Sequence, residues 1–85
     1  MTNKYCKKPI VVEAIEWDGT NYKEVYNFAG DCAILNNNGT LFIKTLEGVM
    51  QVGVGDMVIK GLAGEFYPCR SDIFWNSYDD FEELK

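Results

Sequence analysis

Six side chains have the types and positions needed to recognise a ligand. Most lie in residues 59–70 (IKGLAGEFYPCR), where charged and aromatic groups flank a loop bounded by glycines. A guanidinium binds phosphate through paired hydrogen bonds, and an aromatic ring can stack on a nucleobase. In the alternative interpretation the cations are ordinary surface charges and Tyr67 is a core residue. The candidate ligand-binding residues are Trp17, Lys44, Lys60, Glu65, Tyr67 and Arg70.

The residues that enzymes use for proton transfer and nucleophilic attack are poorly represented. The chain has no histidine, the side chain most often used as a general acid or base. Ser71 and Ser77 stand in no nucleophile-elbow context, and the Gly-Val-Gly-Asp run at residues 53–56 lacks the lysine and helix of a phosphate loop. Arg70 could lower the pKa of the neighbouring Cys69 thiol, but no base or resolving thiol accompanies it. We therefore expect a protein without catalytic residues that is not an enzyme.

The three cysteines, Cys6, Cys32 and Cys69, are too widely spaced for a zinc pattern. Their odd number does not suggest a disulfide framework, so we expect free thiols in a reducing cytoplasm. No metal and no cofactor are expected. The N-terminal residues lack the apolar run of a signal peptide, and no apolar stretch is long enough to span a bilayer. The expected location is the cytoplasm.

The first half of the chain predicts one strand and one helix. Residues 9–17 (PIVVEAIEW) are rich in β-branched side chains and apolar on both faces, which predicts a central strand. Residues 20–29 change to a helical period, with Thr20 or Asn21 as the N-cap and Gly30 in the left-handed region that ends the helix.

From Cys32 onward the pattern predicts a meander of short strands. Asn38-Gly39 predicts a type I′ hairpin turn, and further turns are expected near residues 47–48 and 55–56. Pro68 makes the strand at residues 65–69 an edge strand or an irregular one. Ser71 and Asp72 are expected to cap a short helical turn.

These elements predict an α+β fold: a small curled antiparallel β-sheet or partly open β-barrel, with one helix in the N-terminal half and a short C-terminal helical turn. The 85 residues suffice for one domain, with residues 1–8 as an N-terminal arm and residues 79–85 as a frayed tail. A chain this short has a thin core, and a partner subunit often stabilises such folds. A ligand site would also require a homo-oligomer, which we expect, because an 85-residue domain has little room for an internal pocket of roughly 300 Å³ or more.

Thirteen acidic residues against eight basic ones give a net charge of −5. This balance argues against direct nucleic-acid binding, which requires a basic surface. An acidic surface can instead imitate DNA and occupy a basic groove on another protein, although mild acidity often serves only solubility.

An ordered set of motifs resembles a large family of short proteins from phages and prophages, mostly of Gram-positive hosts and sometimes labelled PGDYG-type. The motifs are KKPIVVEAIEW at residues 7–17, IKTLEG at 43–48, VGDMVIKG at 54–61, GEFYPC at 64–69 and DIF at 72–74. Met57 stands where the family more often has an aromatic residue, and Ser71 where it often has proline. The resemblance implies an accessory factor that acts on the host, and it brings no catalytic residues.

Three functions suit such a factor. The first is a host-defence antagonist that sequesters a nucleotide immune signal, a cyclic nucleotide or an ADP-ribose derivative, at a homo-oligomer interface. Its motivation is the aromatic content of 14% and the cluster of candidate residues. The second is an acidic inhibitor of a host defence protein, similar in action to an anti-CRISPR, whose carboxylates would gather on one exposed face. The third is a minor virion or assembly component.

Overall fold

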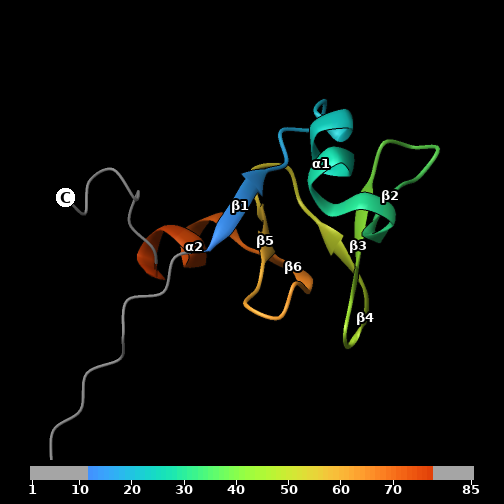
Figure 1. Cartoon of the computed structure of the whole chain (residues 1–85). Coiled ribbons are helices and arrows are strands. Elements are labelled where there is room, and N and C mark those ends of the chain that lie inside the picture. The colour runs from blue at the N-terminus through green and yellow to red at the C-terminus, as the bar shows by residue number, and fades with distance from the viewer. Residues whose placement is uncertain (1–11, 78–85) are drawn as a thin grey trace, which may run out of the picture.

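The computed structural model describes residues 12–77, which fold into six strands, two helices and a short 3₁₀ turn. They form two separate three-stranded antiparallel sheets, with α1 next to the second sheet and α2 next to the first (Figure 1). The elements in chain order are β1 (Glu13–Glu16), α1 (Tyr22–Ala29), η1 (Gly30–Cys32), β2 (Ala33–Leu35), β3 (Leu41–Thr45), β4 (Gly48–Val52), β5 (Met57–Lys60), β6 (Phe66–Cys69) and α2 (Ser71–Ser77). The predicted α+β class is confirmed, and the two sheets do not close into a barrel.

The first sheet has the order β1-β5-β6. β5 is its central strand, and its Met57, Val58 and Ile59 are all buried. The prediction that residues 9–17 form a central strand is wrong for the described part, because β1 lies at an edge; residues 9–11 lie outside the described residues. β1 has apolar side chains on both faces because other side chains pack against both faces of the first sheet. An edge strand can be packed in this way as well as a central one. The edge position predicted for the strand containing Pro68 is confirmed.

The second sheet has the order β2-β3-β4 and is built from two hairpins. The Asn38-Gly39 sequence does turn the chain, but the predicted type I′ geometry is wrong. That type requires positive φ at two successive residues, and among the described residues only glycines have positive φ, here Gly39 at 85°. The hydrogen bonds from Gly39 N to Asn36 O (3.0 Å) and from Asn36 N to Thr40 O (2.9 Å) define a three-residue loop that ends in a glycine bulge.

The helix predicted over residues 20–29 is confirmed as α1. Its N-cap position is Asn21, whose side chain makes no hydrogen bond to the helix. The Asp18 carboxylate instead accepts hydrogen bonds from the backbone N–H groups of Thr20 (2.7 Å) and Asn21 (2.9 Å). Gly30 ends the helix as predicted, but the predicted left-handed conformation is wrong: its φ is 62° and its ψ is −139°, which lies outside the left-handed helical region.

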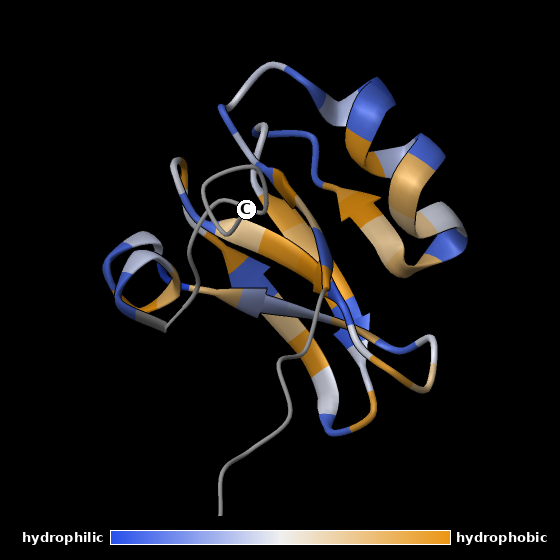
Figure 2. Ribbon diagram, turned by 60° about the vertical axis from the view of Figure 1, so that its left-hand side comes forward, coloured by the Kyte–Doolittle hydropathy of each residue, from blue (hydrophilic) through white to orange (hydrophobic). Residues whose placement is uncertain are grey.

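The main core lies where α1 and the facing sides of the two sheets meet. It combines Trp17 and side chains from α1, β2, β3, β4 and β5. Figure 2 shows orange, hydrophobic segments on the strands and orange segments interspersed with blue ones along α1. A second, smaller cluster covers the other face of the first sheet, where Phe74 of α2 packs with Met57 and Ile59. The buried members of the main core are Trp17, Val25, Ala29, Ala33, Leu41, Ile43, Val52 and Val58.

The helical turn predicted after Arg70 is present as α2, but the capping carboxylate comes from elsewhere. Ser71 N donates to Asp56 Oδ1 (3.2 Å), and Gly53 N donates to Asp56 Oδ2 (3.1 Å). Asp72 Oδ1 accepts from Ile73 N (2.9 Å). The half-buried Asp56 carboxylate thus joins the turn between β4 and β5 to the first residue of α2.

The predicted N-terminal arm (1–8) and C-terminal tail (79–85) lie outside the described residues. Within residues 12–77, neither helix has the length and apolar character needed to cross a bilayer.

Candidate functional site

The interior of the protein opens to solvent near the turn between β3 and β4. The register of this hairpin places Ile43 opposite Met50 and Leu41 opposite Val52, with all four side chains on its core-facing side. Leu41, Ile43 and Val52 are at most 2% exposed, whereas Met50 is 47% exposed. The side chains on the core-facing side of this hairpin (Leu41, Ile43, Met50 and Val52, the core-facing row) therefore extend beyond the part that the first sheet and α1 bury.

The outer edge of β6 lies opposite this open part of the hairpin. Gly61 N donates to Glu65 O (2.7 Å), and Ile59 is the register partner of Tyr67. Because backbone groups alternate between the two sides of an antiparallel strand, Tyr67 bonds toward β5 while Phe66 and Pro68 direct their backbone groups outward. No described strand pairs with this edge.

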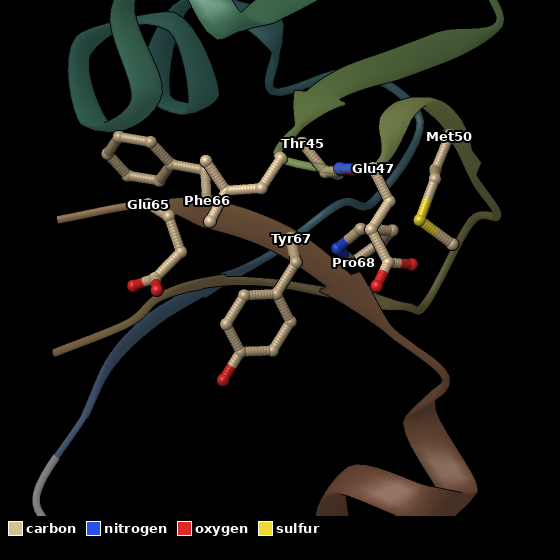
Figure 3. A pocket seen from close by; sticks show the side chains of 8 residues that line it. Thr45, Glu47, Met50, Glu65, Phe66, Tyr67 and Pro68 are labelled. Carbon is tan, nitrogen blue, oxygen red and sulfur yellow. The ribbon is translucent and has the colours of Figure 1, made fainter. Parts of the chain in front are cut away.

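Between the hairpin and β6 lies an open cleft of about 350 Å³. Figure 3 shows side chains from both elements around it, with Met50 and Glu47 on the hairpin side and Pro68 on the β6 side. The exposed Leu46 and Leu62 lie in the loops that end the two hairpins, β3–β4 and β5–β6. The lining residues are Thr45, Leu46, Glu47, Met50, Glu65, Phe66, Tyr67 and Pro68.

Strands β3 and β6 approach each other beside the cleft. Cα atoms of β3 and β6 approach within 8 Å of each other. A strand inserted between them would need roughly twice the 4.7–4.9 Å spacing of paired strands. No strand therefore fits between β3 and β6 where they contact each other.

Among residues 12–77, the charged groups that line the cleft are the carboxylates of Glu47 and Glu65, and no Lys or Arg of this part of the chain lines it. Glu65 Oε1 accepts a hydrogen bond from Ala63 N (3.2 Å), which holds this carboxylate against the loop between β5 and β6. The Thr45 hydroxyl donates to Gly48 O (2.7 Å) and accepts from Glu47 N (3.1 Å), so it is already satisfied within the turn. Glu47 is exposed, and its carboxylate is the one most accessible to a ligand.

Of the six candidate residues, the structure brings only Glu65 and Tyr67 to the cleft. The Tyr67 ring points away from the hairpin in Figure 3, toward the face of the sheet that α2 covers. Trp17 is 2% exposed in the core, so its predicted role in stacking on a ligand is wrong.

The three candidate cations lie apart from the cleft. Lys44 is exposed and projects from the opposite face of β3, because it alternates with Ile43 and Thr45. Lys60 is exposed at the end of β5. Arg70 pairs with Asp72 (3.0 Å), and both side chains are largely exposed, so this ion pair contributes little to stability.

Sequence reasoning missed the hairpin half of the cleft, above all Glu47 and Met50. The available signal was the turn at residues 46–47, which presents a leucine and a glutamate at the end of an apolar hairpin. Leu46 is one of several exposed apolar side chains of this protein, so it does not mark the site by itself, and only the packing of β6 against the hairpin shows that a cleft forms there.

The environment of the Cys69 thiol differs from the one that its sequence neighbour suggested. Burial raises the pKa of the Cys69 thiol, and the charges of Asp56 and Asp72 raise it further. The neighbouring Arg70 thus does not activate this thiol as its position in the sequence suggested. Within residues 12–77, no group of three or more His, Cys, Asp or Glu side chains could hold a metal ion.

Comparisons with family models, curated proteins and solved structures gave no match for this chain. The resemblance to phage proteins therefore stays a prediction from the motifs alone.

Proposed function

We propose that this chain is a non-enzymatic binding domain whose cleft between β6 and the β3–β4 hairpin receives side chains of a partner protein. The observation that carries the proposal is the change in exposure along the core-facing row, from 0% at Ile43 to 47% at its register partner Met50. A partially exposed apolar row beside a cleft is the kind of surface at which protein interfaces place their most important side chains.

The surroundings of the cleft favour a protein over a nucleotide. Cations near its phosphates strengthen the binding of a nucleotide, and the exposed Lys44, Lys60 and Arg70 lie outside the cleft lining. Trp17, the other candidate for stacking, is buried. A nucleotide site at a homo-oligomer interface therefore has less support than a protein site, and the homo-oligomer itself stays a prediction.

A protein target also agrees with the phage resemblance, in which the partner would be a host defence protein. Within residues 12–77, the acidic side chains do not gather on one face. Glu13 and Glu16 occupy opposite faces of β1, Glu24 lies on α1, and Glu47 lies at the cleft. We therefore assign binding to the cleft rather than to the net charge.

The proposal can be tested with a random-peptide display library selected on the immobilised full chain. Met50→Lys fills the cleft with a cation, while Val49→Lys places the same cation on the opposite face of β4, where Val49 is 58% exposed. We expect peptides selected on the wild type to bind Val49→Lys normally and to lose binding to Met50→Lys.

The result that would contradict the proposal is binding that Met50→Lys does not change, or a library that yields no binder. A parallel thermal-shift series with cyclic dinucleotides and cyclic ADP-ribose isomers tests the nucleotide alternative. A clear shift there that Met50→Lys leaves intact would favour sequestration over protein binding.

A further inference from the structure

We propose that the partner residue held by the cleft is an arginine, with its guanidinium at Glu47 and its aliphatic stem over Met50 and Pro68. This inference rests on the proposed function and specifies which partners the cleft accepts. It follows from three properties of the cleft. Hydrogen-bond acceptors outnumber donors beside it, apolar side chains lie next to these acceptors, and the opening admits side chains.

The polar groups that β6 offers on its side away from β5, next to the cleft, are mainly hydrogen-bond acceptors. The carbonyl oxygens of Phe66 and Pro68 point away from β5 along the edge with which no described strand pairs, and the nitrogen of Pro68 carries no hydrogen. The Glu47 carboxylate adds two more acceptor oxygens at the opening. Phe66 N–H is the donor that this stretch of edge contributes, so a ligand with several donors and a positive charge matches the site best.

A guanidinium meets these requirements better than an ammonium. Its five N–H donors lie in one plane and can reach a carboxylate and neighbouring carbonyls at the same time. It is also more weakly hydrated, so its transfer into a half-enclosed cleft costs less free energy. A lysine would offer a compact charge whose hydration shell it keeps more strongly.

The apolar part of the cleft suits the three methylene groups of an arginine. Met50 is half exposed, and Pro68 presents a ring surface on the β6 side, as Figure 3 shows. Long cationic side chains bury their stems along such surfaces while their charged ends remain near water. No strand fits between β3 and β6 where their Cα atoms approach within 8 Å, and the proposal therefore places side chains of the partner in the cleft.

The test uses the peptides selected on the full chain and their synthetic variants. We expect the selected sequences to share an arginine. Replacing it with citrulline, which keeps the shape and removes the charge, should weaken binding about tenfold or more, and lysine should weaken it by about fivefold. Affinities are measured by isothermal titration calorimetry or fluorescence anisotropy.

On the protein side, Glu47→Gln should weaken binding of the arginine peptide by about tenfold, and Glu24→Gln, an exposed carboxylate on α1, should leave it unchanged. Glu47→Gln should also remove most of the discrimination between arginine and citrulline. Because Glu47 is an exposed turn residue, both variants are expected to fold, which circular dichroism verifies.

The outcomes separate this inference from the proposed function. If peptides bind in a manner that depends on Met50 but carry no arginine, or if citrulline binds as well, the arginine assignment is wrong and the protein-binding cleft stands. If free arginine binds as tightly as the peptide, the ligand is a small guanidinium compound and the assignment to a partner protein is wrong. If no binding depends on Met50, both fail.

Discussion

Replacement of Asp56 by alanine should destabilise the protein far more than the half-exposed position of this residue suggests. Its carboxylate accepts hydrogen bonds from Gly53 N (3.1 Å) and Ser71 N (3.2 Å), which belong to segments far apart in the sequence. Each backbone hydrogen bond to a charged acceptor contributes about 1.5–3 kcal/mol to stability. With the lower value for a half-buried site, the loss is about 3 kcal/mol.

For a domain of this size, about 3 kcal/mol corresponds to a decrease in Tm of roughly 12–24 °C. Asp56→Asn retains one acceptor oxygen and should lose about half as much. The matched control is Asp31→Ala. Asp31 is exposed, and its carboxylate accepts one long hydrogen bond, from the Tyr26 hydroxyl (3.3 Å). This control should cost less than about 1 kcal/mol.

The assay is urea denaturation followed by circular dichroism, with thermal unfolding as a second measurement. Hydrogen exchange should also show loss of protection at the start of α2 in Asp56→Ala, because Ser71 N loses its acceptor. If Asp56→Ala unfolds within about 0.5 kcal/mol of the wild type, the Asp56 bridge does not stabilise the fold, and the reasoning is refuted.

Three further predictions follow from the structure. The raised pKa of Cys69 reduces its thiolate fraction, so this thiol should react more slowly with a disulfide reagent at pH 8 than cysteine in an unfolded peptide; equal rates would contradict the burial described for it. Hydrogen bonds from Thr20 lower the pKa of Asp18 below its ordinary value of 3.8, so Asp18 stabilises the fold above that pH and loses this contribution as the pH falls through the lowered pKa. The Tm difference between wild type and Asp18→Asn should shrink in acid, and a constant difference would count against this. Ile43→Ala should cost about 2–5 kcal/mol in urea denaturation, whereas Met50→Ala should cost less than about 1.5 kcal/mol because Met50 is half exposed; equal costs would mean that the cleft is closed.

The local elements were well predicted because short-range patterns determine them. The helical period of residues 22–29 and Gly30 after it predicted α1, and Pro68 predicted an edge strand because proline lacks a backbone N–H. The Asn38-Gly39 turn was located correctly, but its type was not. The strands that flank a turn help to select its geometry, and the sequence of the turn alone does not specify them.

The errors in the candidate site have a common origin in long-range packing. Trp17 and Tyr67 were plausible stacking residues from their types, but an aromatic side chain in a small domain serves the core equally well. Trp17 became a core residue because α1 and both sheets meet around it. Lys44 lies outside the cleft because neighbouring residues of a strand point to opposite faces, and its neighbour Thr45 lines the cleft.

The sequence by itself determined the α+β composition, the position of the helix, the order of short strands and the edge character of β6. Only the tertiary structure decided that the strands divide into two sheets, that β5 rather than β1 is central in the first, and that Asp56 meets the first residue of α2. It also decided where the core opens. A cleft between β6 and the β3–β4 hairpin depends on how two hairpins cross, and that angle results from the packing of side chains distant in the chain rather than from any local pattern.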